Sequence, residues 1–64
     1  MIKKQRLLLR ISQKKLASKL GISRSYLSKI ENKKFRNVKL SLLKNIANEL
    51  NIDLNDLLEW FLDK

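Results

Sequence analysis

The chain has 64 residues, with fifteen Lys and Arg against six Asp and Glu, a net charge of +9, and neither cysteine nor histidine. A chain this short forms one domain of marginal stability, because it buries only about 60% of its unfolded surface. This composition excludes disulfides, thiolate or imidazole metal sites and Ser–His or Cys–His catalysis, and no cofactor is expected. With no apolar run long enough to cross a bilayer and no signal-peptide pattern, a cytoplasmic protein is expected.

Apolar residues three and four positions apart predict helices, and no segment shows the alternation of a strand, so the expected fold class is all-α. The first helix is expected at about residues 2–10, with Ile2, Arg6 and Leu9 on one side. The second and third are expected at about 13–19 and 23–31.

The two remaining helices are expected in the second half of the chain. The fourth, at about 40–50, has an apolar stripe of Leu43, Ile46, Ala47 and Leu50. The fifth, at about 54–62, follows Asp53, a good N-cap residue with Asp56 three positions on. Its stripe is Leu54, Leu57, Leu58 and Phe61.

The only glycine, Gly21, separates the second helix from the third. Glycine accepts the left-handed backbone angles that end a helix, and Ser23 offers a hydroxyl to the first amides of the next one. The apolar positions on either side are Leu16, Ala17 and Leu20 before the turn and Leu27 and Ile30 after it. Two helices across so short a turn are typical of the helix-turn-helix, the DNA-reading unit of many bacterial regulators.

Charge is unevenly divided along the chain. Residues 1–39 contain thirteen bases and one acid, Glu31, whereas residues 40–64 contain two bases and five acids. A basic half joined to a mildly acidic half indicates that one face binds a polyanion, for which nucleic acid is the leading candidate. Lys14, Lys15 and Lys19 are interpreted as long-range steering charges.

Several groups of residues together resemble one family of DNA-binding proteins. They are Ser12-Gln13, Leu16-Ala17, Leu20-Gly21-Ile22-Ser23, Arg24-Ser25-Tyr26, Ile30-Glu31-Asn32, Leu43, Ile46-Ala47 and Leu50-Asn51-Ile52. Over nearly its whole length the sequence resembles the Cro and phage-repressor family of transcriptional regulators, the xenobiotic-response-element type. The departures are Arg10 for a common glycine, Gln5 for a core leucine, Lys33 for the glycine of Asn-Gly-Lys, and Val38 for a proline.

The resemblance implies a compact five-helix, lambda-repressor-like domain over residues 1–64, with the helix-turn-helix at helices two and three. It implies a nucleoid-associated, non-enzymatic protein that binds double-stranded DNA sequence-specifically as a transcriptional regulator. A repressor that binds a palindromic operator as a homodimer is the leading form of this hypothesis.

Base reading is expected from the N-terminal part of the third helix, which lies in the major groove in this geometry. The candidates are Ser23, Arg24, Ser25, Ser28 and Lys29. Arg24 can bond O6 and N7 of guanine together, worth about 1–3 kcal/mol of discrimination, or else contact a phosphate. Lys29 suits either role, and the alternative for Ser25 and Ser28 is a solvated helix surface.

Contacts with the DNA backbone are expected from Gln13, Tyr26, Asn32, Lys33, Lys34, Arg36, Asn37 and Lys39. Gln13 lies at a helix N-terminus, which attracts phosphate, and the resemblance implies a phosphate bond; the alternative is a surface glutamine without contact. Tyr26 contacts a thymine methyl or a phosphate, or props its helix against the scaffold. The loop residues form a backbone clamp or a solvated charged loop.

Two further predictions concern the support and the partner. The resemblance implies that Arg6 forms an ion pair with Glu31 that holds the first helix on the third. Arg10 is the other candidate partner of Glu31. The alternative for the pair itself is an exposed surface contact, which would contribute well under 1 kcal/mol. Trp60 and Leu62 lie off the apolar stripe of the fifth helix and predict a dimer interface. Alternatively, Trp60 folds back over Leu7 and Leu8.

Two other functions remain open from the sequence. One is an antitoxin-type interaction module, whose fifth helix binds a partner protein while the basic half binds its own promoter. The other is a cationic membrane-active peptide, which predicts helicity induced by anionic vesicles, whereas a regulator would be folded in buffer. Catalysis is the weakest interpretation, because nothing arranges a nucleophile, a base and an electrophilic stabiliser.

Overall fold

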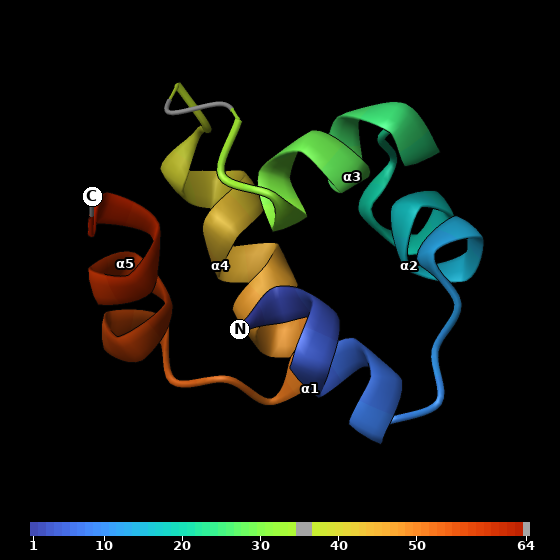
Figure 1. Cartoon of the computed structure of the whole chain (residues 1–64), viewed down its shortest axis with the longest axis horizontal. Coiled ribbons are helices and arrows are strands. Elements are labelled where there is room, and N and C mark those ends of the chain that lie inside the picture. Colours follow the sequence, from blue (N-terminus) through green and yellow to red (C-terminus); the bar gives the residue numbers. More distant parts are fainter. Residues whose placement is uncertain (35–36, 64) are drawn as a thin grey trace.

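The computed structural model describes residues 1–34 and 37–63. In that part the chain forms five helices and no strand, which confirms the all-α class (Figure 1). They are α1 (Ile2–Leu8), α2 (Gln13–Leu20), α3 (Arg24–Glu31), α4 (Leu40–Leu50) and α5 (Leu54–Leu62). The bounds of α4 and α5 agree with the prediction, and those of α2 and α3 differ from it by one residue each.

The first helix is shorter than the predicted range 2–10. It ends at Leu8, and Arg10 adopts the left-handed conformation, with a φ of 57°. The Arg10 and Ile11 amides donate to carbonyls of the last turn of α1, each at 3.0 Å, as in other helix ends with a left-handed residue. Leu9 was predicted to share a face with Ile2 and Arg6; it lies beyond the helix and is 38% exposed, so that prediction is wrong.

Local side-chain hydrogen bonds account for where α2, α3 and α5 begin. Ser12 and Ser23 each accept a bond of 3.0 Å from the backbone amide three residues on, which caps α2 and α3. Asp53 caps α5 as predicted, accepting from two amides at 2.8 and 3.2 Å. Gly21 ends α2 with a φ of 70°, so the predicted turn is present.

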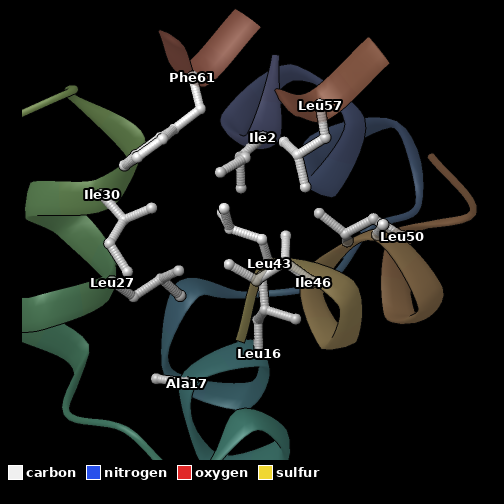
Figure 2. Packing of buried hydrophobic residues seen from close by; sticks show 11 residues of the cluster. Ile2, Leu16, Ala17, Leu27, Ile30, Leu43, Ile46, Leu50, Leu57 and Phe61 are labelled. Atoms are coloured by element: carbon white, nitrogen blue, oxygen red, sulfur yellow. The ribbon is translucent and has the colours of Figure 1, made fainter. Parts of the chain in front are cut away.

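The core lies where all five helices meet around α4, which packs against α1, α2 and α5. Figure 2 shows apolar side chains from every helix pointing into this one interior. The predicted stripe of α4 is buried throughout, whereas on α5 Leu57 and Phe61 are buried and Leu54 and Leu58 are half-buried. The buried apolar residues are Ile2, Leu16, Ala17, Leu27, Ile30, Leu43, Ile46, Ala47, Leu50, Leu57 and Phe61.

One departure from the family pattern has a structural explanation. Gln5, where a core leucine is usual, lies half-buried between α1 and the end of α4. Its Nε2 donates to the Leu50 carbonyl oxygen at 2.9 Å. The last carbonyls of a helix have no partner within the helix, so this bond satisfies an acceptor that a leucine would leave unpaired.

Candidate nucleic-acid interface

The two faces of α3 differ in burial. Leu27 and Ile30 are fully buried and fix the helix on the core. On the opposite side, all five predicted base-reading residues are exposed except Ser28, which is half-buried. Positions 24, 25, 28 and 29 share one face because a helix has 3.6 residues per turn. The exposed face of α3, with its N-cap residue Ser23, therefore presents one arginine, one lysine and three hydroxyls.

A buried ion pair supports the end of α3. Arg6 Nε lies 2.8 Å from Glu31 Oε2, and the two side chains are only 8% and 3% exposed. Arg6 Nη1 also donates to the Ile11 carbonyl oxygen at 3.0 Å. The pair predicted for Arg6 is thus present in its buried form, while Arg10 lies exposed outside it. Inside the protein each charge needs the other, because an unpaired buried charge is costly.

The pair extends through Gln13 to the outward face of α3. Gln13 Nε2 donates to Glu31 Oε1 at 2.9 Å, and Gln13 Oε1 accepts from Arg24 Nε at 3.1 Å. We call these four residues (Arg6, Glu31, Gln13 and Arg24) the polar network. It joins α1, α2 and both ends of α3. Arg24, the first residue of α3, is therefore linked through Gln13 to the buried carboxylate of Glu31.

The polar network bears on two predictions. Both polar atoms of the Gln13 amide are engaged within the protein, which fixes the side chain at the start of α2. Arg24 donates to Gln13 through Nε, which leaves its Nη atoms outside this bond. A guanidinium has five N–H donors, and two of them are enough to bond a guanine. Sequence reasoning missed the contact between Gln13 and Arg24, and no local signal could have found it, because the two residues are on different helices.

Three of the predicted backbone-contacting residues lie together beside the start of α3. Tyr26, Asn37 and Lys39 line one open cavity of about 370 Å³ between the α2–α3 turn and the start of α4. Tyr26 is half-buried and packs on the core, whereas Asn37 and Lys39 are exposed. The body of Tyr26 therefore props α3 on its scaffold, which was one of the alternatives for this residue.

The other predicted backbone contacts are placed differently. Lys34 is exposed, whereas the Asn32 side chain donates to the Ser28 carbonyl oxygen at 2.8 Å and so closes the end of α3. Lys33 Nζ lies 4.8 Å from the centre of the Trp60 ring, a cation–π contact that holds its charge against α5. Arg36 lies outside the described residues.

The predicted dimer residues differ from each other in exposure. Trp60, which lies off the predicted apolar stripe, is half-buried, packs against the core and lies under Lys33. It does not cover Leu7 and Leu8, which stay 57% and 69% exposed. Leu62 is 69% exposed. Burial, with the charges of Lys33 and Lys4, lowers the pKa of the Met1 amine. Met1, the residue before α1, lines one cavity together with Trp60.

Four of the five acidic residues of the second half gather on α5, away from α3, and the fifth, Glu49, is on α4. Asp53, Asp56, Glu59 and Asp63 all belong to α5 or to its two caps. Figure 1 shows α5 on one side of α4, with α2 and the start of α3 on the other. The division of charge along the sequence is therefore also a division in space, as expected for a protein with one face toward a polyanion.

A folded helix-turn-helix with an outward basic face defines a class, that of DNA-binding domains. A family model described as helix-turn-helix matches residues 2–57, so the chain belongs to the helix-turn-helix family of the Cro and phage-repressor, xenobiotic-response-element type. This confirms the resemblance, the lambda-repressor-like fold and sequence-specific DNA binding; the family is non-enzymatic. Comparisons with curated proteins and with solved structures gave no significant match.

Two further observations concern the described part of the chain only. None of its helices is long and apolar enough to cross a bilayer. Its acidic side chains form no cluster of three or more that could bind a metal ion.

Proposed function

We propose that this protein is a transcriptional repressor that binds a palindromic operator as a homodimer and reads the major groove with α3. The observation that carries the proposal is the polar network beneath the exposed face of α3. It holds Arg24 at the N-terminal end of the recognition helix, the part that contacts base edges in a helix-turn-helix. An operator-specific repressor needs such a positioned reader, since discrimination depends on bonds to particular base atoms.

Roles follow from placement. Arg24 bonds a guanine through its Nη atoms while Gln13 holds its Nε, and Lys29 with the serines Ser23, Ser25 and Ser28 contacts the neighbouring base edges. The fork of an arginine bonds both O6 and N7 of guanine, which suits it better to base reading than to a single phosphate bond. Arg24 is therefore the residue on which base preference depends most.

Phosphate contacts flank the reading face. Lys34, Asn37 and Lys39 are exposed on the segment between α3 and α4, and Tyr26 lies beside two of them in one cavity. The free amides at the N-terminus of α2, next to Gln13, attract a phosphate on the other side. We leave Lys33 out of the phosphate contacts, because its ammonium lies over Trp60.

A homodimer fits both the size and the surface of the protein. Recognition helices about 34 Å apart would read two half-sites one turn of DNA apart. The exposed Leu62 and the half-buried Trp60 of α5 provide an apolar surface on the side away from the basic face. A partner bound there leaves α3 free for DNA.

The test compares two single variants in a selection from random duplexes. Arg24→Ala is expected to lose preference at one base pair per half-site, at about 1–3 kcal/mol, and to keep it elsewhere. Lys34→Ala is the matched control: it should weaken all sequences alike and lower the slope of log affinity against log salt by about one. A selection that returns the wild-type site unchanged from Arg24→Ala would contradict the assigned role.

A further inference from the structure

A groove follows α5 from Leu62 to its start and continues there between α5 and α1. Two open cavities of about 620 and 370 Å³ form it, and they adjoin, since Met1 and Asp56 line both. The larger continues along α5 past Trp60 to Leu62, and the smaller reaches Leu8 on α1. The two cavities together are a continuous concave surface, which we call the α1–α5 groove.

The groove gathers apolar side chains that the core leaves uncovered. Met1, Leu8 and Leu62 line it and are 40%, 69% and 69% exposed. They are half of the six large apolar residues that are exposed in the described chain. Grouped apolar exposure on a concave surface with a polar rim is typical of a protein-binding site.

The two rims of the groove carry opposite charges. Along the α5 rim lie Asp53, Asp56, Glu59 and Asp63, which are four of the six acidic residues of the whole chain. On the α1 rim, Lys4 lines the groove, and Lys3, the preceding residue, is exposed. In a protein with a net charge of +9, this acidic rim is the exception, and it selects a partner that is both cationic and apolar.

We propose that the groove binds α1 of a second copy of this chain, whose Lys3, Lys4, Leu7 and Leu8 meet the acidic rim and the apolar floor. This rests on the proposed homodimer and names its contact surface. The four residues are exposed and follow the i, i+1, i+4, i+5 spacing of one helix face. They supply the two properties, positive charge and apolar surface, that the acidic rim and Leu62 require.

The charges decide against the simpler arrangement of α5 on α5. A twofold axis between two copies of α5 would bring the acidic side chains of one helix, Glu59 and Asp63 among them, close to those of the other, and like charges at an interface disfavour association. Since α1 and α5 border the same groove, a twofold axis through it instead places each α1 on the partner's α5. Both contacts then form in the same dimer, so the assembly closes as a pair and does not extend into a filament.

The test uses charge reversal without DNA. One variant carries Lys3→Glu with Lys4→Glu, and the other carries Glu59→Lys with Asp63→Lys. Each is expected to weaken self-association by at least tenfold in sedimentation equilibrium, about 1.4 kcal/mol, because its own rims then repel. Mixed in equal amounts, the two variants should form heterodimers. In a heterodimer, the acidic α1 of one variant meets the basic α5 of the other, and at the second contact the unaltered α1 meets the unaltered α5.

A matched control separates local from global charge. On α2, Lys14→Glu with Lys15→Glu changes the net charge by the same amount and in the same direction as Lys3→Glu with Lys4→Glu, and it should leave the dimer unchanged. Helical circular dichroism with an unfolding curve shows that each variant is folded, and the mixing result is itself a control, because two unfolded variants could not rescue each other.

The outcomes distinguish this inference from the proposed function. Wild-type protein that stays monomeric at all concentrations with and without its operator would overturn the homodimer and this contact together. If the wild type forms a stable dimer and Lys3→Glu with Lys4→Glu does not weaken it, the contact between α1 and the groove is overturned but the homodimer is not. That result would favour a dimer in which α5 packs against α5. A dimer that both reversals weaken but their mixture fails to restore would also overturn the crossed arrangement.

Discussion

The recognition helix α3 and the C-terminal helix α5 are held on the same core in different ways. Both bury two large apolar residues, Leu27 and Ile30 on α3 and Leu57 and Phe61 on α5. Only α3 is also fixed by the polar network, whose side-chain bonds of 2.8 to 3.5 Å reach its two ends. Besides the Asp53 cap at its start, α5 has a cation–π contact between Lys33 and Trp60.

The difference reflects what each helix has to do. Apolar burial is non-directional and fixes a helix on the core without setting the position of an outward side chain. Hydrogen bonds have preferred distances and angles, so they can hold Arg24 where a base edge would lie. The reading side is therefore built for geometry, and the α5 side for stability and association.

The largest expected effect is on the ion pair. Glu31→Ala should lower the free energy of unfolding by about 4 kcal/mol, because it leaves Arg6 buried without its partner. Urea unfolding measured by circular dichroism checks this. Glu49→Ala is the matched control, since Glu49 belongs to an exposed pair with Lys19 at 3.8 Å and should cost well under 1 kcal/mol. If both variants lost the same unfolding free energy, burial of the Arg6–Glu31 pair would not be what makes Glu31 important for stability.

A second change tests the apolar support of α5. Leu57 is fully buried, and Leu57→Ala should cost about 3 kcal/mol of unfolding free energy through lost burial and the cavity left behind. At a temperature where the variant is still folded, its base preference should equal that of the wild type, because the side-chain hydrogen bonds within the polar network join α1, α2 and α3. An altered preference would show that α5 positions α3 after all.

Gln13→Ala tests the network with a smaller expected change in stability. The loss of its bond to Glu31 should cost about 1 kcal/mol in unfolding free energy. In the random-duplex selection, preference should fall at the base pair that Arg24 reads and stay unchanged at the others, because Arg24 loses the acceptor for its Nε. A uniform loss of affinity at every position would instead indicate that Gln13 acts only on phosphate.

The smallest effect concerns the turn between Arg6 and Gln13. Arg10 has a φ of 57°, a conformation that costs most residues about 1–2 kcal/mol and glycine almost nothing. Arg10→Gly should therefore raise the unfolding free energy by about 0.5–1 kcal/mol, after the added freedom of the unfolded chain is counted. Thermal unfolding measures the gain. Base preference should stay the same, and a destabilised variant would contradict the strain at this position.

Much of the fold could be predicted because its signals are local. Gly21, the hydroxyls of Ser12 and Ser23, and the carboxylate of Asp53 set helix ends through groups within a few residues of themselves. The end of α1 was predicted two residues too late because no such local signal marks it. Arg10 occupies a left-handed position that glycine usually marks, so the local signal was missing there.

The sequence by itself determined the five helices, the helix-turn-helix and the separation of basic from acidic residues, since these depend on periodicity, caps and composition. The tertiary structure decided that Gln13 joins Glu31 to Arg24, that Lys33 lies over Trp60, and that Gln5 closes the end of α4. These contacts join residues 11 to 45 positions apart or on separate helices. Each polar side chain has several partners within its reach, and only the packing of the helices selects one of them.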